Sequence, residues 1–161
     1  MAALPRWIWL RVLAFTLFLP GLIVGYAPYY LIITPRRVAG GWPRGAGQVP
    51  AVAVIALGIA IYGACAWRFA TEGLGTPAPY DPPRHLVSGG LYGWSRNPMY
   101  VGITLALLGE AWLFASPAQA VYAALVALAF HARVVWYEEP GLRAKFGEEY
   151  DRYRHAVRRW G

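Results

Sequence analysis

Side chains with chemical potential stand at two points where this sequence enters or leaves an apolar run. Arg96 and Asn97 directly precede the run that begins at Met99, and Glu138 and Glu139 directly follow a run that ends at residue 137. Arginine presents a fork of N–H donors that suits a carboxylate, whereas a glutamate suits an ammonium group. Residues of these types can bind charged groups of a ligand.

Glycines and tyrosines surround the Arg96-Asn97 pair. Gly90 and Gly102 would let a ligand approach the backbone closely, since glycine has no Cβ. Tyr92 and Tyr100 offer ring faces and hydroxyl groups to the same ligand. The segment therefore has both the polar and the apolar surfaces that a binding site needs.

The composition indicates that these residues belong to a membrane protein. Hydrophobic residues make up 58% of the 161 residues and charged residues only 14%, a balance too apolar for an ordinary soluble domain. A chain of this length forms one compact bundle, so any chemistry must belong to the bundle itself. The sole cysteine, Cys65, excludes an intramolecular disulfide and a cysteine-based zinc cage, and no metal site is expected.

Four apolar stretches predict about four transmembrane helices in a single all-α, polytopic bundle. They cover residues 7–33, 49–70, 99–116 and 117–137, each near the roughly 20 residues that cross a bilayer, although the third is short. The turn at Ser116-Pro117 makes residues 99–137 a helical hairpin. Pro20-Gly21 leaves two alternatives for the first stretch, a single span or a re-entrant pair.

The basic residues predict the orientation of this bundle. Of the 15 Lys and Arg residues, all but Arg36, Arg37 and Arg44 share one side if the N-terminus is cytoplasmic. The net charge of +7 is then a topology signal and an attraction to anionic membrane lipids, and no nucleic-acid partner is expected. The loop 71–98 and the tail 138–161 both emerge on that cytoplasmic face.

The tail is expected to form one amphipathic helix. Pro140 suits the first turn of a new helix. Apolar residues then recur at helical spacing opposite charged ones, which indicates a helix on the membrane surface or over the mouth of the bundle. The apolar positions are Leu142, Phe146, Tyr150, Tyr153, Val157 and Trp160.

Two motifs in register give the chain a family resemblance. The segment "GGLYGWSRNPMYVG", followed by a hairpin and by "YEEPGLRAKFGEEYDRYRHAVRRW", resembles the isoprenylcysteine carboxyl methyltransferase family and the related phospholipid N-methyltransferases. Those families show Arg-His/Asn-Pro-x-Tyr-x-Gly before one span, and Glu-Glu, Phe-Gly-x-x-Tyr and a basic tail after the next. The resemblance covers roughly residues 75–160.

The resemblance implies an integral-membrane methyltransferase that uses S-adenosylmethionine. No Gly-x-Gly-x-x-Gly motif follows a strand, so no soluble Rossmann-type domain is expected. The cofactor would therefore bind in a different way. Tyr150 is either a cofactor contact or a packing residue. The implied cofactor-binding residues are Gly90, Tyr92, Arg96, Asn97, Pro98, Met99, Tyr100, Gly102, Glu138, Glu139 and Tyr150.

The same resemblance narrows the catalytic candidates to Arg133, Glu139 and His131. Methyl transfer is an in-line displacement, so the protein mainly positions the acceptor. A carboxylate acceptor needs an aligning cation, for which Arg133 is placed, whereas an amine acceptor needs a base such as His131 or a glutamate.

Structural alternatives exist for most of these residues. Arg96 alone at a membrane threshold is typical of a topology anchor, and the glutamate pair is typical of a helix N-terminus. His131 could equally be a hydrogen-bonded structural histidine. Glu110, inside the third stretch, is either functional or paired, with Tyr122 as the candidate partner. Around Gly102, small residues predict either close helix packing or a gap for an acyl or prenyl chain.

The sequence as a whole predicts methyl transfer from S-adenosylmethionine to a lipid-like or isoprenylcysteine-type acceptor, carboxylate or amine, reached from the bilayer. The expected location is a cell inner membrane, or the endoplasmic reticulum in a eukaryote, with the active site facing the cytoplasm. One alternative is an NADPH-dependent reductase of the sterol-reductase type, and another is a non-catalytic membrane scaffold.

Overall fold

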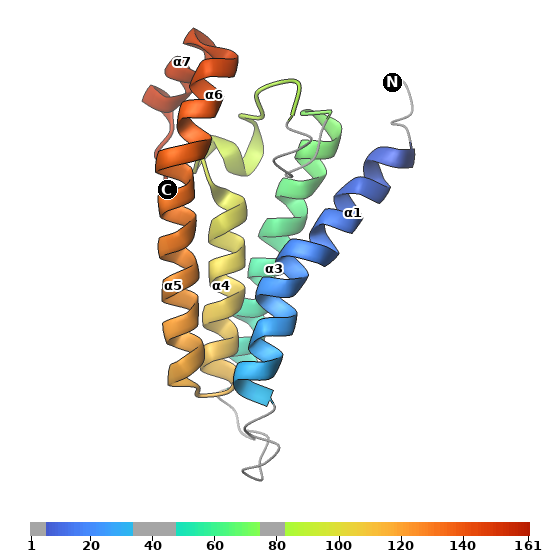
Figure 1. Cartoon of the computed structure of the whole chain (residues 1–161), viewed down its shortest axis with the longest axis vertical. Coiled ribbons are helices and arrows are strands. Elements are labelled where there is room, and N and C mark those ends of the chain that lie inside the picture. The colour runs from blue at the N-terminus through green and yellow to red at the C-terminus, as the bar shows by residue number, and fades with distance from the viewer. Residues whose placement is uncertain (1–5, 34–47, 75–82) are drawn as a thin grey trace.

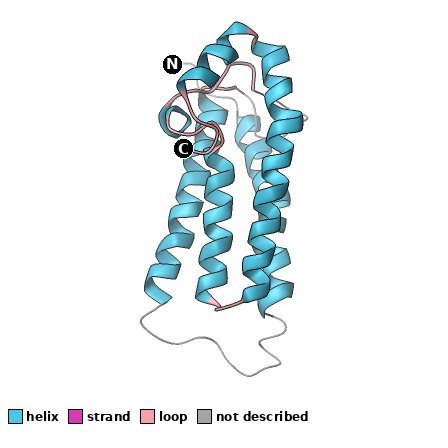
Figure 2. Cartoon of the chain, turned by 90° about the vertical axis from the view of Figure 1, so that its left-hand side faces the viewer, coloured by secondary structure: helices cyan, strands magenta, loops and turns pink. Residues whose placement is uncertain are grey.

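The computed structural model describes residues 6–33, 48–74 and 83–161. Within these residues it contains helices and loops but no strand (Figure 2). Three of the described helices, Trp7–Leu31, Gln48–Thr71 and Pro117–Phe146, are long and apolar enough to cross a membrane. The predicted all-helical membrane bundle is confirmed.

The first apolar stretch forms one continuous helical run. It begins as α1 (Arg6–Pro20) and widens into π-helical turns at η1 (Gly21–Tyr26) and η2 (Tyr29–Ile33). Proline removes a backbone donor and crowds the preceding turn of an α-helix, and the wider π geometry starting at Gly21 accommodates this. The chain does not reverse at Pro20-Gly21, so the re-entrant alternative is wrong.

The next two predicted spans form α3 (Gln48–Thr71) and α4 (Pro98–Leu113), which pack closely, although α4, with 16 residues, is shorter than the three helices long enough to cross a membrane. A Cβ atom added to Gly58 would lie 2.5 Å from the Gly102 carbonyl oxygen, and one added to Gly102 would lie 2.7 Å from the Gly58 oxygen. Only glycine permits this approach of two backbones. Of the two alternatives around Gly102, the structure therefore shows close packing, and Ala106 is buried within it.

The helical hairpin continues from α4 into α5 (Pro117–Arg133) through a short turn. The Gln119 backbone N–H donates to Ser116 Oγ at 3.3 Å, which caps the start of α5. Glu110 accepts a 2.8 Å hydrogen bond from Gln119 Nε2, whereas the Tyr122 hydroxyl donates to the Ile23 carbonyl. Glu110 is therefore paired, but its hydrogen-bond partner is Gln119, while the hydroxyl of Tyr122, the candidate partner, donates elsewhere.

The second hairpin helix runs on into the tail. After α5 come the π-helical η4 (Val134–Glu138) and α6 (Glu139–Phe146), so that Pro117–Phe146 is one helix of 30 residues. Pro140 thus lies within a continuous helix, directly after a π segment that accommodates its missing donor. The helix N-terminus proposed at the glutamate pair does not exist.

The tail contains two helices in place of the one expected. Gly147, with φ of 54° and ψ of −126°, ends α6, and α7 (Glu148–Ala156) follows. A left-handed φ breaks the helical path, and glycine adopts it most easily. The apolar stripe is nevertheless the packed side of both helices, since Leu142 and Phe146 are partly buried and Tyr150 is fully buried.

Polar segments gather at one end of the bundle. The C-terminal end of α3, the 3-10 helix η3 (Gly90–Gly93), the start of α4, and α6 and α7 lie together at the top of Figure 1. The turn between α4 and α5 lies at the opposite end. Loop residues such as Thr76, Tyr80 and Asp81, and the basic residues Arg36, Arg37 and Arg44, fall outside the described residues.

Candidate active site

A cavity of about 410 Å³ lies at this polar end. Its walls come from α3, the loop after residue 83, the start of α4, the η4 and α6 turns, and α7. The volume falls within the range of small-molecule sites. The lining residues are Phe69, Pro83, Leu86, Val87, Tyr92, Arg96, Asn97, Met99, Tyr100, Arg133, Tyr137, Glu138, Gly141, Leu142, Lys145, Phe146 and Tyr153.

The cavity wall is amphipathic. Phe69, Leu86, Val87, Met99 and Phe146 give it a broad apolar face. The charged lining residues among the described ones are the cations Arg96, Arg133 and Lys145 and a single carboxylate, Glu138. Such a wall suits a ligand with an apolar body and a charged head.

Glu138 is fixed in this wall by two donors. The Tyr100 hydroxyl and Arg133 Nε both donate to Glu138 Oε1, the latter at 2.7 Å. Arg133 Nε also lies 3.3 Å from the Tyr100 oxygen, and the Tyr100 ring stacks on Phe130 at 4.3 Å between centroids. Arg133 and Glu138 are five residues apart, and the wider π turn between them brings them to the same side of the helix.

Glu139 belongs to a different cluster, behind the cavity wall. Arg159 binds both of its carboxylate oxygens, through Nε at 2.8 Å and Nη2 at 2.9 Å. Arg96 Nη1 lies 3.1 Å from Glu139 Oε1 and donates to the Tyr150 hydroxyl at 3.3 Å. The side chains of Arg96 and Glu139 are only 9% and 12% exposed. We call Arg96, Glu139 and Arg159 the buried ion triad after its central carboxylate; the Arg159 side chain itself is 34% exposed.

The backbone of Arg158 and Arg159 is tied to the residues that directly precede α4. The Arg96 backbone N–H donates to the Arg158 carbonyl at 2.9 Å, while Ser95 Oγ and Asn97 Nδ2 both donate to the Arg159 carbonyl at 3.1 Å. Ser95 has no exposed surface. The Asn97 amide therefore holds the end of the chain in place.

Arg96 retains one unmatched donor. Its Nε is buried and has no hydrogen-bond partner among the described residues, although the side chain lines the cavity. Buried N–H groups of guanidinium are nearly always paired, because leaving one unpaired is costly. The cavity is therefore suited to a ligand that brings an acceptor atom, such as a carboxylate, to Arg96.

The tyrosines on this side of the site are neutral. Tyr153 donates its hydroxyl to the Tyr92 carbonyl at 2.7 Å, which ties α7 to η3. Burial raises the pKa of the Tyr92, Tyr150 and Tyr153 hydroxyls above the ordinary value. The hydrogen bonds to Glu139 raise the pKa of the Arg159 guanidinium, which therefore stays charged. These tyrosines can shape the site or donate to a ligand, but they do not act as bases near neutral pH.

Comparison with known proteins identifies the family of this chain. The profile of the phospholipid methyltransferase family matches residues 48–149, which include α3, the hairpin and most of the cavity wall. The chain belongs to the phospholipid methyltransferase family. This confirms the resemblance seen in the sequence.

Curated relatives of this phospholipid methyltransferase family member match over part of their length. A probable protein-S-isoprenylcysteine O-methyltransferase from Oryza sativa subsp. indica is 32% identical over 78 residues, 48% of this chain and 41% of the relative. Protein-S-isoprenylcysteine O-methyltransferase A from Arabidopsis thaliana is 33% identical over 78 residues, 48% of this chain and 40% of the relative. Protein-S-isoprenylcysteine O-methyltransferase from Schizosaccharomyces pombe is 33% identical over 72 residues, 45% of this chain and 30% of the relative. No solved structure matches the chain at comparable significance.

About half of the predicted site residues line the cavity in the structure. Arg133, which the sequence proposes as an aligning cation, is among them. Predicted site residues that line the cavity are Tyr92, Arg96, Asn97, Met99, Tyr100, Arg133 and Glu138.

The other predicted residues are engaged elsewhere. Gly102 serves the packing of α4 on α3, and Gly90, with φ of 56°, allows the Arg68 guanidinium to lie against its backbone. His131 accepts a 3.2 Å hydrogen bond on Nδ1 from Trp160 Nε1, away from the cavity lining. Pro98 begins α4, and Glu139 and Tyr150 lie in and beside the buried ion triad. His131 and Glu139 therefore do not line the cavity.

Several residues in or beside the site are not predicted from the sequence, among them one lining cation and two residues that hold neighbouring segments. Lys145 lines the cavity, Ser95 anchors the tail, and Arg159 holds Glu139. Lys145 directly precedes Phe146 of the apolar stripe, which was a usable signal. Arg159 is one of several basic residues in the tail, and only the fold distinguishes it from the others.

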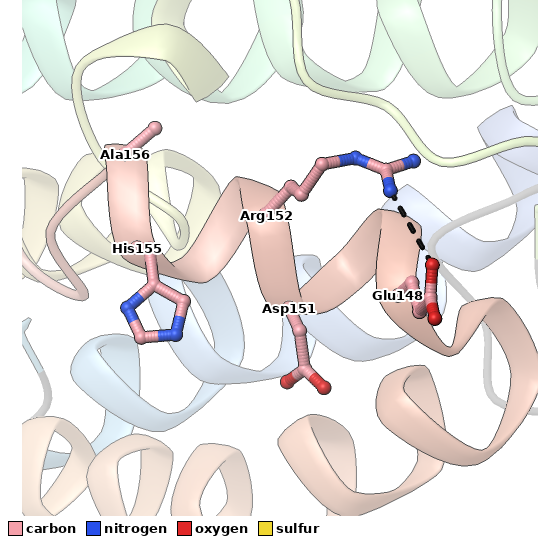
Figure 3. Close-up of a pocket in the computed structure, with 5 residues that line it drawn as sticks. All are labelled: Glu148, Asp151, Arg152, His155 and Ala156. Carbon is pink, nitrogen blue, oxygen red and sulfur yellow. Dashed lines mark ion pairs between the residues drawn. The ribbon is translucent and has the colours of Figure 1, made fainter.

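A second hollow lies on α7, apart from the cavity. Figure 3 shows its residues, with Arg152 and Glu148 joined by a 3.7 Å ion pair. All five lining residues belong to one helix, so no second element of the described chain lines the hollow. The residues are Glu148, Asp151, Arg152, His155 and Ala156.

Proposed function

We propose that this chain is an S-adenosylmethionine-dependent methyltransferase whose acceptor is anchored in the membrane. The observation that carries the proposal is the amphipathic cavity, whose charged lining residues in the described part of the chain are one fixed carboxylate, Glu138, and three cations. It lies within the segment that matches the phospholipid methyltransferase family. The family match also favours methyl transfer over the reductase and scaffold alternatives.

The cavity residues fit the cofactor. Glu138 suits an ammonium group, while the unpaired Nε of Arg96, together with Lys145, suits a carboxylate. The ring of Phe69 and the side chain of Met99 line the cavity and would give apolar contact to an adenosine. When bound, S-adenosylmethionine supplies a methyl group activated by its sulfonium centre.

The charges of the wall favour an acceptor with a carboxylate. Arg133 lines the cavity and is 39% exposed, so its guanidinium can align an anionic oxygen while Glu138 fixes its Nε. A carboxylate needs no proton removed before it is methylated. An amine acceptor would instead need Glu138 to take a proton, although that carboxylate is already held by Tyr100 and Arg133.

The acceptor is proposed to arrive from the side, out of the bilayer. Tyr137 lines the cavity yet is 62% exposed, and its neighbour Trp136 is 79% exposed. Both lie on the long apolar helix Pro117–Phe146, which supports this side of the cavity wall as the route from the bilayer. A soluble enzyme would have to extract the apolar chain of the acceptor from the bilayer, at a free-energy cost of about 0.8 kcal/mol for each methylene. An enzyme in the membrane avoids this cost. The cofactor would enter from the cytoplasm, on the face where the loop and the tail lie.

The proposal is tested by transfer of a labelled methyl group from S-adenosylmethionine in lipid vesicles. A farnesylated cysteine derivative with a free carboxylate should be methylated, whereas the same carboxylate without its apolar chain should not. A phosphatidylethanolamine vesicle without the prenyl compound tests the amine alternative. Methylation of that lipid alone would overturn the carboxylate assignment, and no transfer to any membrane acceptor would overturn the proposed function.

A further inference from the structure

Arg159 contacts the site from outside the segment that matches the family, which ends at residue 149. Its carbonyl oxygen accepts from Ser95 and Asn97, and its guanidinium holds both oxygens of Glu139. Glu139 is in turn ion-paired with Arg96, whose side chain lines the cavity. The last residues of the chain are therefore linked to the cavity through two buried charges.

We propose that Arg159 is a positioning residue that keeps Arg96 available to an anionic group in the cavity. The inference rests on the proposed function, because it takes the carboxylate of S-adenosylmethionine as that group. Arg159 occupies both oxygens of Glu139 with a planar fork, whereas Arg96 reaches one of them, through Nη1. Arg96 Nε is left without a partner among the described residues.

The physical reason is competition for one buried carboxylate. Glu139 is 12% exposed, and a charge at that depth is costly unless it is paired. Without Arg159, the carboxylate would have Arg96 as its remaining guanidinium partner and would draw that side chain away from the cavity. Arg159 prevents this by satisfying Glu139, although it is not itself among the cavity lining residues.

The neighbouring Arg158 provides a matched control. The side chain of Arg158 is exposed, and its contact with the site is through its backbone carbonyl, which accepts from the Arg96 N–H. Arg158→Gln and Arg159→Gln therefore remove the same charge one residue apart. Only the second substitution removes a partner of Glu139.

The first experiment measures the affinity of the full-length protein for S-adenosylmethionine by calorimetry in detergent. Arg159→Gln should weaken binding about tenfold, the factor expected when a charge-assisted hydrogen bond to the ligand is lost, while Arg158→Gln should bind like the wild type. Arg159→Lys should lie between them, since an ammonium supplies charge without the planar fork. Thermal unfolding of each variant reports whether the fold is retained.

The second experiment separates positioning from a general structural role. The double variant Glu139→Gln/Arg159→Gln removes the carboxylate that would capture Arg96, so its affinity should recover most of the loss seen in Arg159→Gln. A purely structural role predicts that the double variant binds no better than the single one. If Arg159→Gln does not fold, Arg159→Lys alone and combined with Glu139→Gln gives the same comparison.

The outcomes distinguish this inference from the proposed function. Wild-type protein that binds S-adenosylmethionine, with Arg159→Gln equal to Arg158→Gln in affinity, would overturn the positioning role and leave the methyltransferase proposal standing. A double variant that is weaker than Arg159→Gln would also overturn it. Wild-type protein that does not bind the cofactor would overturn the proposed function, and this inference with it.

Discussion

Two adjacent glutamates with the same side chain have different surroundings in this protein. Glu138 lies in the cavity wall, where Tyr100 and Arg133 donate to one of its oxygens. Glu139 lies behind the wall in the buried ion triad. Of the two, only Glu138 lines the cavity, so replacing each residue separately should give different kinds of effect.

At the residue scale, we predict that Glu138→Gln weakens binding of S-adenosylmethionine about tenfold or more, because it removes the lining carboxylate that suits the cofactor's ammonium group. Calorimetry on the purified variant measures this. Glu148→Gln on α7 is the control, since the Glu148 side chain is 95% exposed and lies in the hollow outside the cavity. Equal affinities of the two variants would exclude Glu138 from the cofactor site.

At the scale of helices, the contact between α3 and α4 depends on glycine. We predict that Gly102→Ala destabilises the protein by about 1–3 kcal/mol, because its Cβ would lie 2.7 Å from a backbone oxygen of Gly58 that has no room to move. Gly63→Ala on α3 meets nothing within 4 Å and should be neutral or slightly stabilising, as alanine favours a helix. Thermal unfolding in detergent compares them, and equal midpoints would contradict the close packing.

The break between α6 and α7 makes a second prediction at this scale. Gly147→Ala should lower the midpoint of thermal unfolding, since φ of 54° with ψ of −126° is strained for any residue with a Cβ. Gly141→Ala, inside α6 and with nothing within 4 Å, should raise it or leave it unchanged. If Gly147→Ala unfolds no earlier than Gly141→Ala, then α6 and α7 form one straight helix in solution.

The sequence predicts where the helices lie and which residue types belong to the site. It does not predict which side of a helix each residue occupies. The apolar runs predict the spans, and the motifs predict that Arg96, Tyr100, Arg133 and Glu138 share a site; the structure places all four around one cavity. The π-helical turn of η4 has no local sequence mark, because Pro140 is also typical of a helix start. That turn directs Glu138 and Glu139 to different clusters, so their separate surroundings could not be derived from the sequence.

At the scale of the molecule, the polar segments and both described ends of the chain lie at one end of an apolar bundle (Figure 1). We predict that reporter tags at the N-terminus, in the loop 71–98 and at the C-terminus all lie in the cytoplasm, because all but three of the 15 Lys and Arg residues then share that side. Accessibility to membrane-impermeant reagents measures this in intact cells. A tag on the opposite side at any of these positions would overturn the proposed orientation.

The central claim is that the cavity at this end of the bundle binds S-adenosylmethionine for methyl transfer. The most direct measurement is equilibrium binding of labelled S-adenosylmethionine and, separately, of labelled NADPH to the purified wild-type protein in detergent. Saturable binding of S-adenosylmethionine, lost on Glu138→Gln and retained on Glu148→Gln, with no saturable binding of NADPH, is the predicted result. Saturable binding of NADPH in place of S-adenosylmethionine, or binding of neither, would contradict the claim.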